Sequence, residues 1–274
     1  MIQKKKSDYK TFPFSMNRQV MAAALDIARQ QNNIQAIIEV DISKPRSIIH
    51  KHHQKTGEKL SLTAYVVVCL AKTIVKHPQM NAFRKGKKLI LFDNVTISVL
   101  VEREINGEMM PENLGVQFAQ NKSLREINTE IRQAQKQIGG ELGGLSKTTW
   151  IRFIPVFLLR TFVHLASPNI SMMDRFGAVG VTAVGMFAKK NQALWMLPLV
   201  GGATVALAVG GIVERPCLID GILEAREHLC LTVTFNHEIV DGAPAARFLN
   251  NFSTTLSSGE LLLDEVNHVQ TSHL

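Results

Sequence analysis

The residues best suited to proton transfer lie near the C-terminal end of the chain, in the stretch LTVTFNHEIVDGAPAARFL at 231–249. The residues before His237 predict a strand that delivers this histidine to its end, and Asp241 and Gly242 then turn the chain into a helix. Histidine is the side-chain type whose ordinary pKa lies near neutral, which suits it to general base catalysis. Asp241 could hold neighbouring groups in place through ionic hydrogen bonds.

Residue types alone leave other interpretations open. A histidine at a strand end is more often structural, and Asp-Gly is an ordinary turn dipeptide. His50 and His53 lie three apart on one predicted helical face, where a solvated surface is the simpler reading. Cys69, Cys217 and Cys230 are far apart and odd in number, which fits neither a disulfide framework nor a zinc site. We therefore expect no metal, and reduced thiols in a cytoplasmic protein.

Composition limits the possible partners. The 274 residues carry a net charge of +8, which suits an anionic ligand. The charge is scattered apart from 4–6 and 84–88, and the chain has two Trp and two Tyr. Because a nucleic-acid surface combines a basic face with aromatic residues, we expect no nucleic-acid partner.

Two apolar stretches are candidates for membrane spans. The uncharged stretch 193–213 is interrupted by Pro198 and by two Gly-Gly pairs, which favour a turn followed by a strand. The stretch 151–165 contains Arg152, Arg160 and His164, which are costly in a bilayer centre. A peripheral membrane contact at 151–165 remains open, and the basic N-terminus lacks the apolar run of a secretory signal.

Apolar periodicity, capping residues and breakers predict an α/β protein, because strands and helices interleave along the chain. Ser15 and Ser61 are predicted N-caps, and Ser123 with Glu126 forms a predicted capping box. The predicted helices are 16–31, 44–55, 62–77, 123–138 and 244–256, and the predicted strands are 34–42, 88–92, 95–102, 178–184, 204–209 and 230–237.

The stretch NHEIVDGAPAARFL resembles the H-x-x-x-D-G signature of the 2-oxo acid dehydrogenase acyltransferase catalytic domain, shared more distantly with chloramphenicol acetyltransferase. Further segments resemble the same family in order and spacing: MNRQVMAAAL (16–25), IIEVDIS (37–43), LTAYVVVCLAKTIVKHPQMNAF (62–83), VTAVGMF (181–187) and AVGGIVERP (208–216). The resemblance covers 16–138 and 178–259. It implies the coenzyme A-dependent acyltransferase fold, a mixed sheet covered by helices.

The resemblance also implies a mechanism. His237 would deprotonate the thiol of coenzyme A or of an acceptor such as dihydrolipoamide, and the thiolate would attack an acyl thioester. Thr182, three residues before Gly185, occupies the position of the family's hydroxyl that hydrogen-bonds the oxyanion. The competing reading is a β-branched residue that simply fills a strand. Asp241 would support the site through an ion pair, with Arg18 of the first helix as a possible partner.

The family places its active site between the subunits of a trimer, so the resemblance implies a homotrimer or a multiple of one. Acyl-CoA would be the donor, while the acyl group and the acceptor, a thiol or another small nucleophile, stay open. Two alternatives are a catalytically silent trimeric scaffold and an acyltransferase that acts at a membrane surface on a lipid-like acceptor.

The chain departs from the family at defined places. Glu238 stands where the family usually has Arg, Ala183 replaces an Asn, and PLVGG (198–202) replaces a proline-rich loop. The apolar and basic insert at 139–177 contains Phe157 and Phe162, which are candidates to border the acyl or acceptor pocket. The simpler alternative is that this segment packs only on its own subunit or on a neighbouring one.

We expect an N-terminal arm at 1–15, a catalytic domain at 16–262 and a flexible tail at 263–274. Nothing in the sequence resembles a lipoyl domain, so we expect a free-standing form of the catalytic domain.

Overall fold

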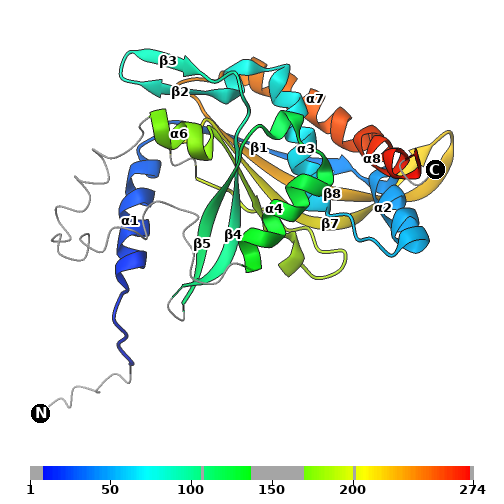
Figure 1. Cartoon of the computed structure of the whole chain (residues 1–274), viewed down its shortest axis with the longest axis horizontal. Helices are drawn as coiled ribbons and strands as arrows, with labels where there is room; N and C mark the ends of the chain where they lie inside the picture. Colours follow the sequence, from blue (N-terminus) through cyan, green and yellow to red (C-terminus); the bar gives the residue numbers. More distant parts are fainter. Residues whose placement is uncertain (1–8, 106–107, 137–169, 200–201, 272–274) are drawn as a thin grey trace, which may run out of the picture.

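A computed structural model describes residues 9–105, 108–136, 170–199 and 202–271. A six-stranded mixed sheet forms the centre of the molecule, as the α/β prediction requires (Figure 1). Its strands in spatial order are β1 (Asn33–Asp41), β8 (Ile222–Asn236), β7 (Val205–Ile219), β6 (Val179–Ala183), β4 (Ile97–Ile105) and β5 (Glu108–Val116). Strand β6 runs parallel to both of its neighbours, whereas the other pairs are antiparallel.

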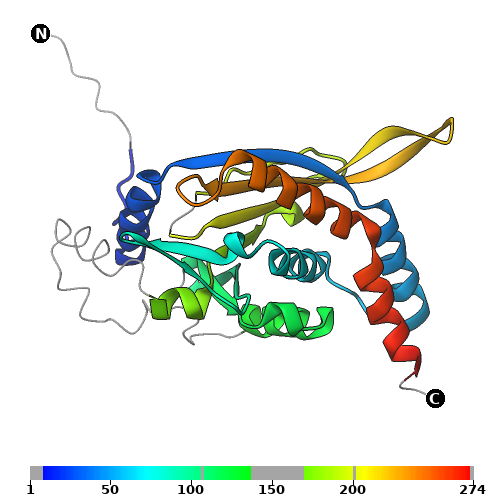
Figure 2. The same cartoon turned by 90° about the horizontal axis from the view of Figure 1, so that it is seen from above.

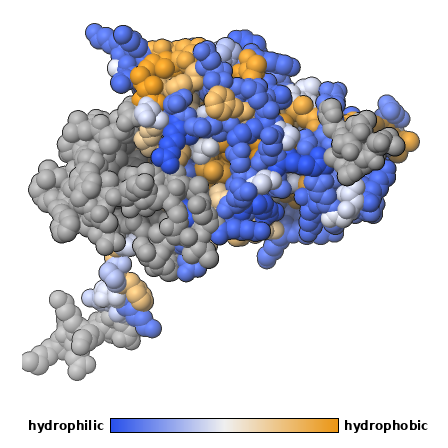
Figure 3. All heavy atoms as spheres, in the orientation of Figure 1, coloured by the Kyte–Doolittle hydropathy of each residue, from blue (hydrophilic) through white to orange (hydrophobic). Residues whose placement is uncertain are grey.

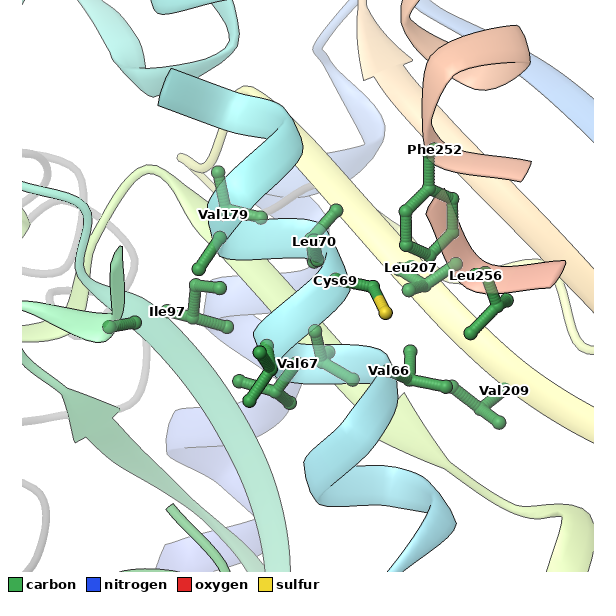
Figure 4. Close-up of a cluster of buried hydrophobic side chains, with 14 of the residues drawn as sticks. Val66, Val67, Cys69, Leu70, Ile97, Val179, Leu207, Val209, Phe252 and Leu256 are labelled. Atoms are coloured by element: carbon green, nitrogen blue, oxygen red, sulfur yellow. The ribbon is translucent and has the colours of Figure 1, made fainter. Parts of the chain in front are cut away.

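Helices cover the core face of this sheet (Figure 2). Helix α3 is apolar almost all round because it packs against α4 and α7 as well as the sheet. Alternate strand residues such as Val181, Leu207 and Val233 meet it in one hydrophobic core, part of which is drawn in Figure 4. The described helices of eight or more residues are α1 (Met16–Arg29), α2 (Ser43–Thr56), α3 (Leu62–Val75), α4 (Leu124–Lys136), α7 (Gly242–Ser258) and α8 (Glu260–Thr271).

Local signals explain where the helices begin and end. The Ser61 hydroxyl accepts a hydrogen bond from the Ala64 amide at 3.3 Å, as an N-cap does. The predicted capping box is confirmed: the Ser123 amide donates to Glu126 at 2.7 Å, and the Glu126 amide donates to the Ser123 hydroxyl at 3.2 Å. Helix α2 ends at Gly57, whose φ of 75° lies in the left-handed region that favours glycine.

The hairpin of β7 and β8 is much longer than the sequence indicated. The predicted strands 204–209 and 230–237 extend to Ile219 and back to Ile222, where a turn at Asp220 and Gly221 joins them. The prediction fell short because the added residues alternate less clearly than the buried part. Beyond the core the hairpin is held by its backbone ladder, and its tip exposes Leu218, Ile222 and Leu223 (Figure 3).

Two strands were not predicted. Strand β5 contains Pro111 and lies at the edge of the sheet, where a missing backbone donor is tolerated. Strand β2 (Ala82–Lys85) has four residues and pairs with β3 (Lys88–Leu91) in a separate hairpin, so β3 does not pair with β4.

The described part of the expected tail at 263–274 is helical, because α8 continues to Thr271. Arg125 of α4 contacts this helix. Its guanidinium binds Glu265 of α8 at 2.9 Å and both carboxylate oxygens of Glu58 at 2.8 Å. The same Glu58 contacts the buried His52 at 2.7 Å, so α8, α4 and the end of α2 are joined by one charged cluster.

This cluster predicts a pH dependence of stability. The Arg125 guanidinium holds the pKa of Glu58 well below its ordinary 4.5, at about 2. A carboxyl with a lowered folded-state pKa stabilises the fold above its unfolded pKa and loses that effect as the pH falls through the folded value. Glu58→Gln should therefore lower the free energy of unfolding at pH 7 by about 1 kcal/mol, a value reduced for the partial exposure of Glu58.

Urea unfolding at pH 7, 4 and 3 measures this difference, which should shrink steadily between pH 4.5 and about 2. Glu227→Gln, in the exposed pair with Arg46, provides a control with a small expected effect. A difference between wild type and Glu58→Gln that stays constant from pH 7 to pH 3 would contradict the assignment.

Candidate active site

His237 directly follows the last residue of β8, as predicted. The backbone around it is fixed on both sides: the Asn236 amide donates to the Thr204 carbonyl at 2.9 Å, and the His237 amide donates to the Asn32 carbonyl at 2.7 Å. The Asn236 carbonyl accepts from the Val240 amide at 3.0 Å, which closes the turn. The His237 side chain is 43% exposed, so a fixed backbone presents an accessible imidazole.

The turn brings Asp241 back to the imidazole. Nδ1 of His237 lies 3.5 Å from Oδ1 of Asp241, an ion-pair distance when the ring is protonated. Asp241 is the residue immediately before α7, where the positive end of a helix dipole favours a carboxylate. An exposed imidazole with an adjacent, helix-stabilised carboxylate can accept a proton and hold the resulting positive charge.

Gly242 does not serve the tight turn that the sequence suggested. Its φ is not in the left-handed region, and no described atom lies within 4 Å of a Cβ built on it. The hydrogen bonds to Asn236 make the turn instead.

Thr182 lies on the sheet face opposite the core. Its neighbours Val179 and Val181 point into the core, so Thr182 projects to the other side, between Leu100 of β4 and Ala208 of β7. Its side chain is partly exposed. This orientation leaves the hydroxyl available to a ligand.

Thr182 and His237 do not meet within one chain. Ala208, the neighbour of Thr182, pairs with Thr232 of β8, which is five residues before His237. This offset corresponds to about 16 Å along the strand, and two strand spacings add about 10 Å sideways. A thiol and a thioester in contact could not reach both groups of the same chain.

Gly185 permits a close backbone contact at the end of β6. A Cβ there would lie 2.0 Å from the Gly210 carbonyl oxygen, and a Cβ on Gly210 would lie 1.9 Å from the Leu194 carbonyl oxygen. Gly210 and Gly211 occupy an irregularity in β7 between Val209 and Ile212. The need for glycine at positions 210 and 211 was not predicted, although a glycine pair inside a strand is the signal for such a close contact.

Glu238 forms contacts that sequence analysis could not predict. Its Oε2 lies 2.7 Å from the Arg84 guanidinium of β2, and its Oε1 accepts a hydrogen bond from the Asn32 side-chain amide at 3.3 Å. The departure from the family at 238 was the available signal, but the partners lie far away in sequence.

The roles of the remaining predicted site residues stay predictions. Arg18 lies in α1, and the ion pair recorded for Asp241 is with His237, so the pair of Arg18 with Asp241 stays a prediction. Phe157 and Phe162 fall outside the described residues, as does the membrane-contact stretch 151–165.

Of the insert, Ile170–Phe176 forms the short helix α6. Among the helices that the structure describes, none has the length and apolarity to cross a membrane.

Comparison with known families shows to which family the chain belongs. The family described as 2-oxoacid dehydrogenases acyltransferase (catalytic domain) matches residues 6–141 and 177–263. The chain belongs to this family. The gap in the match at 142–176 falls within the expected insert at 139–177.

A relative of this chain is the dihydrolipoyllysine-residue acetyltransferase component of the pyruvate dehydrogenase complex of Mycoplasma capricolum subsp. capricolum. The two are 27% identical over 223 residues, which are 80% of this chain and 43% of the relative. This chain spans about half the length of the curated relatives it matches.

Solved structures show the fold. The cubic core of the pyruvate dehydrogenase multienzyme complex has a TM-score of 0.69 at 17% identity, covering 93% of this chain and 94% of that chain. Azotobacter vinelandii dihydrolipoamide acetyltransferase, studied for the catalytic role of a serine, a histidine and an asparagine, has a TM-score of 0.68 at 16% identity, with coverages of 93% and 94%. The predicted coenzyme A-dependent acyltransferase fold is confirmed.

Proposed function

We propose that this protein is a coenzyme A-dependent acyltransferase that passes an acyl group between coenzyme A and a thiol acceptor of the dihydrolipoamide type. The observation that carries this proposal is the position of His237, accessible at the end of β8 and 3.5 Å from Asp241, inside the sequence signature of the family. In the Azotobacter enzyme, the asparagine follows the histidine by four positions, as Asp241 follows His237 here.

The proposed reaction needs one base and one hydrogen-bond donor. His237 accepts the proton of the attacking thiol, and the thiolate adds to the thioester carbonyl carbon. The Thr182 hydroxyl donates a hydrogen bond to the oxygen on which negative charge develops. When the tetrahedral intermediate collapses, the original carbon–sulfur bond breaks and the departing thiolate takes the proton back from His237. No acyl-enzyme forms.

The exposed lysines of the β2–β3 hairpin support the choice of an anionic donor. Lys85, Lys87 and Lys88 lie on this hairpin, which the pair of Arg84 with Glu238 holds beside the His237 turn. Their positive charge favours the phosphates of acyl-CoA.

The proposal is tested by incubating the purified chain with a panel of acyl-CoA donors and dihydrolipoamide. Mass spectrometry then measures S-acyl dihydrolipoamide and free coenzyme A. Equal formation of the two products supports transfer. Release of coenzyme A without acylated acceptor would indicate hydrolysis, and no release from any donor would favour a silent scaffold.

The distance between Thr182 and His237 supports a homotrimer in which each site combines His237 of one subunit with Thr182 of the next. Such a cyclic assembly predicts complementation. Chains carrying His237→Ala and chains carrying Thr182→Val should each be nearly inactive alone. Every mixed trimer nevertheless contains one site with both intact groups, so mixed assemblies should recover about one third of wild-type turnover.

Co-expression of the two variants with different affinity tags, followed by purification on both tags, isolates the mixed assemblies. Each variant purified alone is the control for residual activity. Mixed assemblies no faster than either variant alone, or a fully active monomer by light scattering, would contradict the shared site.

A further inference from the structure

The charge network around Glu238 lies directly beside the proposed base and has no part in the chemistry described above. Glu238 follows His237 in the chain, and its carboxylate contacts two segments that are distant in sequence. One is the connection between α1 and β1, through Asn32. The other is the β2–β3 hairpin, through Arg84.

Asn32 links this network to His237 itself. Its backbone carbonyl accepts the His237 amide at 2.7 Å, while its side-chain amide donates to Glu238 at 3.3 Å. The Glu238 amide in turn donates to the Asn236 side chain at 3.0 Å. The residues on both sides of His237 are therefore held by contacts that converge on Asn32 and Glu238.

A contribution to the stability of the fold does not explain the ion pair between Arg84 and Glu238. Arg84 is 55% exposed and Glu238 is 30% exposed, and an ion pair that solvent reaches contributes little to stability. Its geometric effect is different, because His237 sits on a turn whose last fixed strand residue is Asn236. Small displacements of a catalytic group can cost about a hundredfold in rate.

We propose that Glu238, held by Arg84 and Asn32, is a positioning residue that sets the orientation of His237. This inference rests on the proposed acyl transfer. It also accounts for the departure from the family at this position: an arginine at 238 would face Arg84, whereas glutamate attracts it. Arg84 of the β2–β3 hairpin and Glu238, which follows His237, act as one unit.

A charge swap tests the unit. Arg84→Glu alone and Glu238→Arg alone each place like charges together, and each should lower kcat by about ten- to a hundredfold, with the KM for dihydrolipoamide within about twofold. The melting temperature should change by no more than about 3 °C. The double variant R84E/E238R restores the pair, and Asn32 can turn its amide oxygen toward an arginine. It should regain at least tenfold over the slower single variant.

The swap of Arg46 and Glu227 is the matched control. This pair is also exposed, with a separation of 3.3 Å, and lies where α2 meets the far part of β8. Its single and double variants should keep wild-type kcat. Single variants at 84 and 238 with kcat within twofold of wild type, or a double swap as slow as the slower single, would overturn the proposal.

Amide hydrogen exchange of the segment 232–241 gives a second readout that does not depend on activity. Each single variant should speed exchange of the His237 amide by about tenfold, and the double swap should restore slow exchange. If wild type transfers no acyl group but exchange follows this pattern, the proposed function fails and the positioning stands. If exchange is the same in all four proteins, the positioning fails whatever the activity.

Discussion

Replacement of His237 by alanine should lower kcat by about two to four orders of magnitude, the usual contribution of a positioned general base. The fold should survive, because the side chain is 43% exposed and its recorded ion pair with Asp241 lies at the exposed end of the site. Turnover of acetyl-CoA with dihydrolipoamide and the melting temperature together measure the two effects.

His228→Ala is the control for this experiment. His228 lies on β8, nine residues before His237, where its Nδ1 is 3.2 Å from the Arg226 carbonyl oxygen. The His228→Ala variant should keep wild-type kcat. A His237→Ala protein that is folded and fully active would show that His237 is not the general base.

Replacement of Thr182 by valine should lower kcat by about a hundredfold or more, because valine keeps the shape of the side chain and removes the donor to the oxyanion. The partly exposed position on the face away from the core predicts little loss of stability. Substrate KM should change less than kcat, since the hydrogen bond forms only as charge develops.

Thr182→Ser separates the two readings of this residue. Serine keeps the hydroxyl and loses the methyl group, so its kcat should stay within a fewfold of wild type. If the valine and serine variants have the same kcat, Thr182 is a strand residue without a role in the reaction.

Most elements could be predicted because their signals are local. Ser61, the capping box at Ser123 and Gly57 act on residues a few positions away, and the structure confirms helices beside all of them. The family signature placed His237 at a strand end for the same reason. Asp241 was expected to support the site, with Arg18 as a possible partner, but its contact with His237 was not predicted.

What could not be predicted depends on strand order. The separation of Thr182 from His237 follows from the order β8-β7-β6 and its register, which no local pattern contains. The pairing of Glu238 with Arg84 joins residues more than 150 positions apart. Strand β5 was not predicted because Pro111 argues against a strand unless the strand is known to lie at the edge of the sheet.

The separation of Thr182 and His237 on the sheet also has a genetic consequence. In the proposed trimer, a chain that lacks both groups spoils two sites, because it fails its neighbour on each side. With equal amounts of intact and doubly altered chains assembling at random, about a quarter of the sites would remain, below the half expected for a self-contained enzyme. An allele whose defective chain still folds would then be partly dominant, whereas an allele whose chain cannot fold would be recessive.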